Sequence, residues 1–222
     1  MISLDRIASL VSRSNATILE IGANDGTDTR RIAELFPYGD VIAFEPDPRA
    51  AQRFRERTDD ARIHLFELAI GAEIGKTIFH QSGGTWPYGE EQRLLQGIPL
   101  DWDQSGSIRR PKLHVEVYPW VKFDNDIEVS ITTLDKWAEE TDIKLVDFIW
   151  ADVQGAEVDL IKGAQSILRW TRYLYTEFSK IELYDGAPNV EEISSLLPDF
   201  EIIEIFDQDA LFINKNLAGL FA

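Results

Sequence analysis

A glycine turn between an apolar run and a helical pattern carries the first chemical signal. The segment 18–27 reads Ile-Leu-Glu-Ile-Gly-Ala-Asn-Asp-Gly-Thr, with Gly22 and Gly26 four residues apart. Glycines at such a turn let a ligand approach the backbone closely. Asp25 in the turn and Glu20 before it would repel a pyrophosphate and suit a positively charged ligand such as a sulfonium. A plain strand-to-helix turn is the alternative.

Carboxylates also stand where later apolar runs end. Glu45 follows the second run, where an acid in nucleotide-binding α/β folds accepts hydrogen bonds from ribose hydroxyls. Asp152 ends the fourth run and Glu177 the fifth, and ligands of open parallel sheets bind beyond this edge. Two adjacent carboxylates there can activate a hydroxyl or hold Mg²⁺ through oxygen ligands. Simple surface acids and, for Asp152, a helix N-cap are the alternatives.

Histidine is the third residue type that could do chemistry here, and the chain has three. His64 falls in or beside an expected strand and is interpreted as structural. His80 ends an expected strand, and His114 lies in the long segment that follows. Either is a candidate general base if it reaches an acceptor hydroxyl, and a structural role is the alternative for both.

The elements that must position these residues alternate between apolar runs and amphipathic helices. We expect helices at 4–11, 28–36, 49–57, 156–168 and 190–197, and strands at 17–21, 41–44, 63–69, 145–151, 173–176, 200–206 and 211–214. This alternation predicts an α/β fold with a doubly wound, mostly parallel, seven-stranded sheet in one domain over 1–222. Residues 207–210 are too few for a crossover, so the last two strands must form an antiparallel hairpin. A Rossmann-like sheet with that ending is typical of class I methyltransferases.

Residues 82–122 interrupt the alternation between expected strands at 76–80 and 128–132. This segment holds three of the six tryptophans, namely Trp86, Trp102 and Trp120. Aromatic residues argue against disorder, and a long loop in a compact domain is often functional. We therefore expect an ordered lid or substrate wall over the active site. A decorative insertion or an oligomer contact is the alternative.

Together these motifs resemble the FkbM family of S-adenosylmethionine-dependent O-methyltransferases. The matching segments are 18–27, 41–48, 67–69, 131–137, 147–164 and 175–179. The resemblance implies that Asp152 faces the reacting methyl group. It also implies an S-adenosylmethionine site at Glu20, Gly22, Asn24, Asp25, Gly26 and Glu45, with Glu67 and Leu68 near the adenine. The family methylates hydroxyls of sugars and of natural products such as polyketides.

An alkyl hydroxyl is a weak nucleophile, so the reaction needs a base or a metal. We expect Asp152 and Glu177 to act directly or through Mg²⁺, with His114 or His80 as a protein base. The expected acceptor is a saccharide or glycosylated small molecule, because flat aromatic faces suit stacking on a sugar ring. The candidate acceptor residues are Trp86, Tyr88, Trp102, Trp120 and Gln154.

Three other functions stay open at this point. The first is methylation of a non-sugar natural-product or lipid hydroxyl. The second is a nucleotide-binding module without methyl transfer, and the third is an interaction scaffold. The apolar tail Leu217–Ala222 also leaves open a homodimer contact.

Composition excludes several other classes. Lys and Arg total 22 against 39 Asp and Glu, and the net charge of −17 disfavours nucleic acid and anionic membrane surfaces as partners. The absence of cysteine excludes disulfides and cysteine-based sites. The chain has no apolar run near the ~20 residues of a membrane span, and its N-terminus lacks a signal-peptide core. We therefore expect a cytoplasmic protein without membrane insertion.

Overall fold

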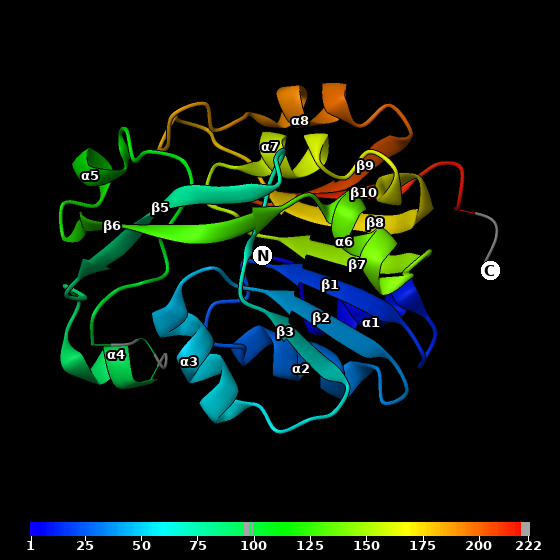
Figure 1. The fold of residues 1–222 in the computed structure, drawn as a ribbon, viewed down its shortest axis with the longest axis horizontal. Helices are drawn as coiled ribbons and strands as arrows, with labels where there is room; N and C mark the ends of the chain where they lie inside the picture. Colours follow the sequence, from blue (N-terminus) through cyan, green and yellow to red (C-terminus); the bar gives the residue numbers. More distant parts are fainter. Residues whose placement is uncertain (96–97, 99, 219–222) are drawn as a thin grey trace.

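A computed structural model describes residues 1–95, 98 and 100–218. Its centre is a seven-stranded sheet in the order β3-β2-β1-β7-β8-β10-β9 (Figure 1). The strands are β1 (Thr17–Ile21), β2 (Asp40–Phe44), β3 (Ile63–Phe66), β7 (Val146–Ala151), β8 (Thr171–Glu177), β9 (Phe200–Ile205) and β10 (Asp209–Asn214). β10 runs antiparallel to β8 and β9, which confirms the predicted doubly wound sheet and its closing hairpin. The switch point, where the strand order reverses, lies between β1 and β7.

Helices cover both faces of this sheet because its central strands are apolar on both sides. Ile18 of β1 packs with α1 (Leu4–Val11) and α2 (Thr27–Leu35) on one face. Leu19, its neighbour, packs on the other face with α6 (Leu134–Thr141), α7 (Glu157–Lys162) and α8 (Val190–Leu196). This alternation is what a buried parallel strand requires. α3 (Pro48–Arg57) packs through Phe54 against Ala43 of β2 and Leu65 of β3.

A second, three-stranded sheet lies beside the first, in the order β4-β6-β5. It consists of β4 (Ala69–Ile70), β5 (Gly75–Gly84) and β6 (Val121–Thr132). β5 and β6 are longer than expected and include both ends of segment 82–122, because their antiparallel pairing continues from Gly75 to Gly84. Between them the chain forms α4 (Glu90–Leu95) and α5 (His114–Val117), drawn in green at the left of Figure 1. We call residues 82–122 the insertion.

Two expected elements differ from the structure. The strand expected at 63–69 is split, since β3 ends at Phe66 and Ala69–Ile70 pair with β6 in the other sheet. The helix expected at 156–168 ends at Lys162 and is followed by the 3-10 helix η1 (Ile167–Trp170). Gly163 interrupts it where the backbone passes so close to Gly71 that a Cβ would overlap the Gly71 carbonyl oxygen. Sequence periodicity does not register such backbone contacts.

In the part of the chain that the structure describes, each helix is too short or too polar to cross a lipid bilayer.

Candidate active site

A cavity of about 670 Å³ opens at the carboxyl ends of β1, β2 and β7, the edge at which open parallel sheets bind ligands. Its volume falls within the range of small-molecule and cofactor sites. Nine predicted site residues line it: Glu20, Gly22, Asn24, Asp25, Glu45, Leu68, Trp102, Asp152 and Gln154. The structure therefore brings together most of the expected cofactor residues and part of the acceptor set.

Close packing explains the two glycines of the turn. Gly22 has φ +92°, and a Cβ there would overlap the carbonyl oxygen of Asp152. The backbone N–H of Asp152 donates to the Ile21 carbonyl (2.9 Å), so this contact seals β1 against β7 at the switch point. Gly26 has φ +74°, and a Cβ there would lie 2.7 Å from the Phe54 ring. Both positions need glycine for the fold, whatever the turn binds.

Asp25 has partners within the protein on both carboxylate oxygens. One accepts the backbone N–H (3.1 Å) and hydroxyl (2.7 Å) of Thr27, at the start of α2. The other forms an ion pair with Arg57 of α3. Asp25 thus holds the first residue of α2 and ties it to α3, and its charge is largely balanced by Arg57.

Glu20 and Glu45 are the buried acids of the cofactor side. Glu20 accepts a hydrogen bond from the Thr29 hydroxyl, and burial raises the pKa of Glu20 to about 8. Glu45 accepts the backbone N–H groups of Asn24 (2.8 Å) and Asp47 (2.7 Å), and burial raises the pKa of Glu45 to about 8. The side-chain oxygen of Asn24 is buried, and it has no hydrogen-bond partner among the described residues. These are polar groups that a bound ligand would satisfy.

At the next two strand ends, Asp152 and Glu177 form a carboxyl pair. Burial raises the pKa of Asp152, while hydrogen bonds with Gln154 and Glu177 partly offset this. Burial and the neighbouring Asp152 raise the pKa of Glu177 well above its usual range. The two acids are therefore disfavoured from being ionised at the same time. Asp152 lines the main cavity, whereas Glu177 borders a smaller cavity of about 30 Å³.

The histidines do not line the main cavity. His80 is buried, with Nδ1 2.5 Å from a carboxylate oxygen of Asp126. His114 is buried in the insertion, and its ring lies 5.3 Å from that of Tyr184. Burial lowers the pKa of His114 to about 4, so this imidazole is neutral at pH 7. His64 is exposed beside Asp40 at the far end of β2.

The aromatic residues of the insertion form one cluster, of which Trp102 lines the cavity. Trp86 stacks on Trp102 with ring centroids 5.4 Å apart, and Trp120 packs edge-on against Trp102 at 4.9 Å. Tyr88 contacts Trp86 from the outer side and is 63 % exposed. Trp86, Tyr88 and Trp120 thus support Trp102 from outside the cavity. Glu67 is likewise outside and forms an ion pair with Arg55, whereas Leu68 lines the cavity.

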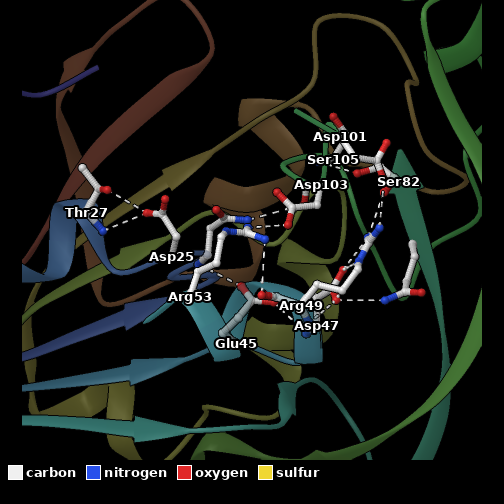
Figure 2. Close-up of polar contacts among 12 residues, drawn as sticks. Asp25, Thr27, Glu45, Asp47, Arg49, Arg53, Ser82, Asp101, Asp103 and Ser105 are labelled. Atoms are coloured by element: carbon white, nitrogen blue, oxygen red, sulfur yellow. Dashed lines mark hydrogen bonds and ion pairs between the residues drawn. The ribbon is translucent and has the colours of Figure 1, made fainter. Parts of the chain in front are cut away.

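Sequence reasoning missed a polar network that ties the insertion to α3. Figure 2 shows Arg49 and Arg53 reaching from this helix toward acids and backbone groups of other segments. Arg53 forms an ion pair with Asp103, whose carboxylate is buried at the cavity wall. Arg49 binds Asp47 (2.7 Å) and donates to the Ser82 carbonyl (2.8 Å). An arginine-rich helix facing an acidic loop was the available signal, but it did not specify these pairs.

Sequence reasoning also missed Tyr184, in the loop between β8 and α8. It is 2 % exposed, and its hydroxyl lies 2.9 Å from Gln154 Oε1 and 2.8 Å from the Ser105 carbonyl. No motif marks this tyrosine in the sequence.

The residues present fit S-adenosylmethionine better than they fit a metal. Glu45 has the acceptor chemistry for ribose hydroxyls, and the unpartnered Asn24 oxygen offers a further acceptor for a ligand N–H or O–H. No group of three or more metal-ligating side chains occurs in the residues that the structure describes. Asp152 and Glu177, the predicted Mg²⁺ ligands, are therefore only two carboxyl groups, and they interact with each other through a hydrogen bond.

Sheet order, terminal hairpin and the site at the switch point together define a class I, Rossmann-like methyltransferase. A Staphylococcus aureus protein provisionally assigned as a caffeoyl-CoA O-methyltransferase has the same fold, with a TM-score of 0.50 at 12% identity over 96% of this chain and 85% of that one. The model of the FkbM methyltransferase domain matches residues 20–207. The chain therefore belongs to the FkbM methyltransferase family.

Relatives with assigned names agree with this family. The chain is 43% identical to the 2-O-methyltransferase NoeI of Sinorhizobium fredii over 217 residues, 96% of this chain and 85% of the relative. It is 26% identical to Methyltransferase 1 of Beauveria bassiana over 153 residues, 66% of this chain and 57% of that protein. The protein is an S-adenosylmethionine-dependent O-methyltransferase, which confirms the predicted class and cofactor.

Proposed function

We propose that this enzyme methylates a hydroxyl group of a saccharide or glycosylated acceptor, with Asp152 as the base. The observation that carries the proposal is that one cavity is lined by the glycine turn, by Asp152 and by the Trp102 indole. A flat aromatic face beside hydrogen-bonding carboxylates is the usual recognition chemistry for a sugar ring. The named relative NoeI, a 2-O-methyltransferase, supports an oxygen acceptor of this kind.

The cofactor side of the cavity is formed by the first two strands. Bound S-adenosylmethionine supplies an electrophilic methyl group. Glu45 would accept hydrogen bonds from ribose hydroxyls, while Asn24 and the glycine turn would border the rest of the molecule. Glu20, Asp25 and Gly26 stay predicted cofactor residues, as do Leu68 and the more distant Glu67.

Asp152 would take the proton of the acceptor hydroxyl. In the reaction the acceptor O–H bond would break, and its proton would pass to a carboxylate oxygen of Asp152. The new O–CH₃ bond would form as the S–CH₃ bond breaks, with the electron pair of that bond left on sulfur and S-adenosylhomocysteine as the leaving group. Glu177 interacts with that carboxylate, and repulsion between two negative charges keeps the two acids from ionising together. The pair therefore provides one base whose orientation is set before the acceptor binds.

Two other activation routes stay as predictions. One is the predicted Mg²⁺, which Asp152 and Glu177 would hold and whose positive charge would lower the pKa of the acceptor hydroxyl. The other uses His114 or His80, neither of which lines the main cavity. The acceptor roles of Trp86, Tyr88, Trp120 and Gln154 are equally predictions. So are a cytoplasmic location and a homodimer, which cell fractionation and light scattering of the purified protein would test.

The deciding experiment measures S-adenosylhomocysteine release on a panel of short neutral oligosaccharides, with Mg²⁺ and with a chelator. We expect turnover on at least one saccharide, and activity in chelator if Asp152 acts without metal. Asp152→Asn should lower kcat by about 100-fold or more, since general bases contribute ~10²–10⁴ in rate. Its affinity for S-adenosylhomocysteine, measured by calorimetry, should stay within about threefold of wild type.

Three results would count against parts of this proposal. Turnover on polyketide or lipid hydroxyls but on no saccharide would replace the acceptor class. Loss of activity in chelator would favour the Mg²⁺ route. Near-normal turnover by Asp152→Asn, with cofactor bound, would remove Asp152 as the base and direct attention to His114 and His80.

A further inference from the structure

We propose that Gln154 and Tyr184 are positioning residues that orient the Asp152 carboxylate and couple it to the insertion. This inference rests on the proposed role of Asp152 as the base. It concerns two side chains that lie on different segments and meet beside the carboxyl pair.

The backbone at Gln154 is held in an unusual conformation. Gln154 has φ +51°, in the left-handed region that non-glycine residues rarely adopt. Its carbonyl accepts a hydrogen bond from the Ser107 hydroxyl (2.8 Å), which comes from the insertion. Gly155 follows with φ +92°, and a Cβ there would lie 2.8 Å from the Tyr184 side chain. The turn at residues 154–155 is therefore held by the Ser107 hydroxyl on one side and packed against Tyr184 on the other.

The Gln154 side-chain amide links Asp152 to Tyr184, with its NH₂ group toward Asp152 and its oxygen toward Tyr184. Its Nε2 donates to Asp152 Oδ1 (2.6 Å) and lies 3.4 Å from a Glu177 oxygen. Its Oε1 faces the Tyr184 hydroxyl at 2.9 Å. The reverse amide orientation would place an oxygen against the Asp152 carboxylate, which is repulsive. Tyr184 therefore faces the acceptor end of the amide, and the donor end stays on Asp152.

Tyr184 extends this contact to the insertion. Its hydroxyl also lies 2.8 Å from the Ser105 carbonyl, so one proton is shared between two acceptors. Its ring packs on His114, 5.3 Å away, and its backbone pairs with Pro111. The segment that forms the cavity wall and the residue that takes the proton are thus joined through two side chains.

Acidic side chains surround Asp152, which makes the hydrogen bond from the Gln154 amide important for its charge. The titratable groups that face Asp152 or interact with it come from every neighbouring element: Glu20 on β1, Glu157 on α7, Glu177 on β8, Asp209 on β10 with the Met1 amino group beside it, and Tyr184. Most are acids that disfavour a second negative charge. The Gln154 N–H is a neutral donor in the middle of this group, and it stabilises the ionised form of Asp152.

The test uses Gln154→Asn and Tyr184→Phe in the otherwise unchanged enzyme. Asparagine tolerates the left-handed backbone but is too short to keep both contacts of the amide. Tyr184→Phe keeps the ring over Gly155 and removes the hydroxyl. Tyr118→Phe is the control, because Tyr118 packs on the same His114 ring at 5.1 Å from outside the amide contacts.

Two readouts separate positioning from simple destabilisation. The first is the pH dependence of kcat/KM, whose acid limb should move up by about 0.5–1 pH unit in both variants because a stabilising donor is lost or misoriented. The second needs no acceptor: ¹³C NMR titration of carboxyl-labelled aspartates, with Asp152 assigned from Asp152→Asn, should show the same upward shift. We expect kcat to fall about tenfold, with KM for S-adenosylmethionine within twofold.

The outcomes are distinct. An unchanged Asp152 titration in both variants overturns the positioning role, even if both are less stable to heat. A shift in Tyr118→Phe as large as in Tyr184→Phe overturns it as well. If the NMR titration shifts but the wild type methylates no saccharide, positioning stands and the proposed acceptor fails.

Discussion

At the scale of single residues, similar carboxyl groups in this cavity acquire different roles from their partners. Asp25 is engaged by Thr27 and Arg57, whereas Glu45 is held by two backbone N–H groups and borders the cavity. The turn motif indicated Asp25, together with Glu20, as acids that suit a cationic ligand. The structure makes Glu45 the better candidate for a ligand contact, because no positively charged side chain pairs with it in the described residues.

The cofactor role of Glu45 is testable by calorimetry. Glu45→Gln places an NH₂ group against one of two backbone N–H donors and removes an acceptor for ribose hydroxyls. We expect the Kd for S-adenosylhomocysteine to rise about 10- to 100-fold, the equivalent of one or two lost hydrogen bonds. Glu34→Gln, an exposed position on α2, should leave the Kd within twofold. An unchanged Kd for Glu45→Gln would mean that this acid serves the turn alone.

At the scale of elements, the insertion is held by contacts that differ greatly in burial. Arg53 of α3 pairs with Asp103, whose side chain is 2 % exposed, while Arg55 of the same helix pairs with Glu67 at about half exposure on both sides. A buried charge that loses its partner is costly, whereas exposed pairs contribute little. The attachment of the insertion should therefore depend on Arg53 far more than on Arg55.

Urea denaturation of two matched variants tests this difference. We expect Arg53→Met to lower the free energy of unfolding by about 2 kcal/mol, because Asp103 stays buried without its cation. Arg55→Met should change it by less than about 0.5 kcal/mol. Adding Asp103→Asn to Arg53→Met should restore part of the loss. Equal effects of the two arginine variants would show that the Arg53 pair does not hold the insertion.

At the scale of the whole molecule, the acidic composition has a consequence for stability. Burial raises the pKa of Glu20 and Glu45 to about 8 and that of Glu157 to about 7. Between pH 4.5 and 8 the unfolded chain releases protons that the folded chain keeps at these positions. Stability of the ligand-free protein therefore falls as pH rises through this window. His114, whose pKa burial lowers to about 4, acts in the opposite sense but only below about pH 6.5.

Thermal unfolding from pH 6.5 to 8 checks this sign. We expect the Tm of the ligand-free protein to decline across the window, and Glu20→Gln to make the decline shallower because one titrating group is removed. An exposed acid, for example Glu56, changed to Gln should leave the slope as in the wild type. A Tm that rises over this range would mean that these acids are ionised in the folded protein.

The sequence by itself determined the fold class and the class of enzyme, because the patterns that indicate them lie within short segments of the chain. Apolar runs such as 17–21 and 41–44 fall within one residue of β1 and β2, and four residues before Leu211 required a hairpin. Glu45 and Asp152 line the same cavity since parallel strands end at a common edge, whereas Glu177 borders the smaller cavity beside it. These relations need no knowledge of distant contacts.

Tertiary structure alone decided how the site is held together. The close contact of Gly163 with the Gly71 backbone and the pairing of Arg53 with Asp103 both join residues far apart in the sequence. Tyr184 reaches Gln154 from a loop 30 residues further along the chain. Contacts between residues far apart in sequence leave no periodicity or motif, because packing geometry rather than local conformation selects them. The strand ends therefore indicate the class of enzyme, whereas the packing around them decides how Asp152 is held.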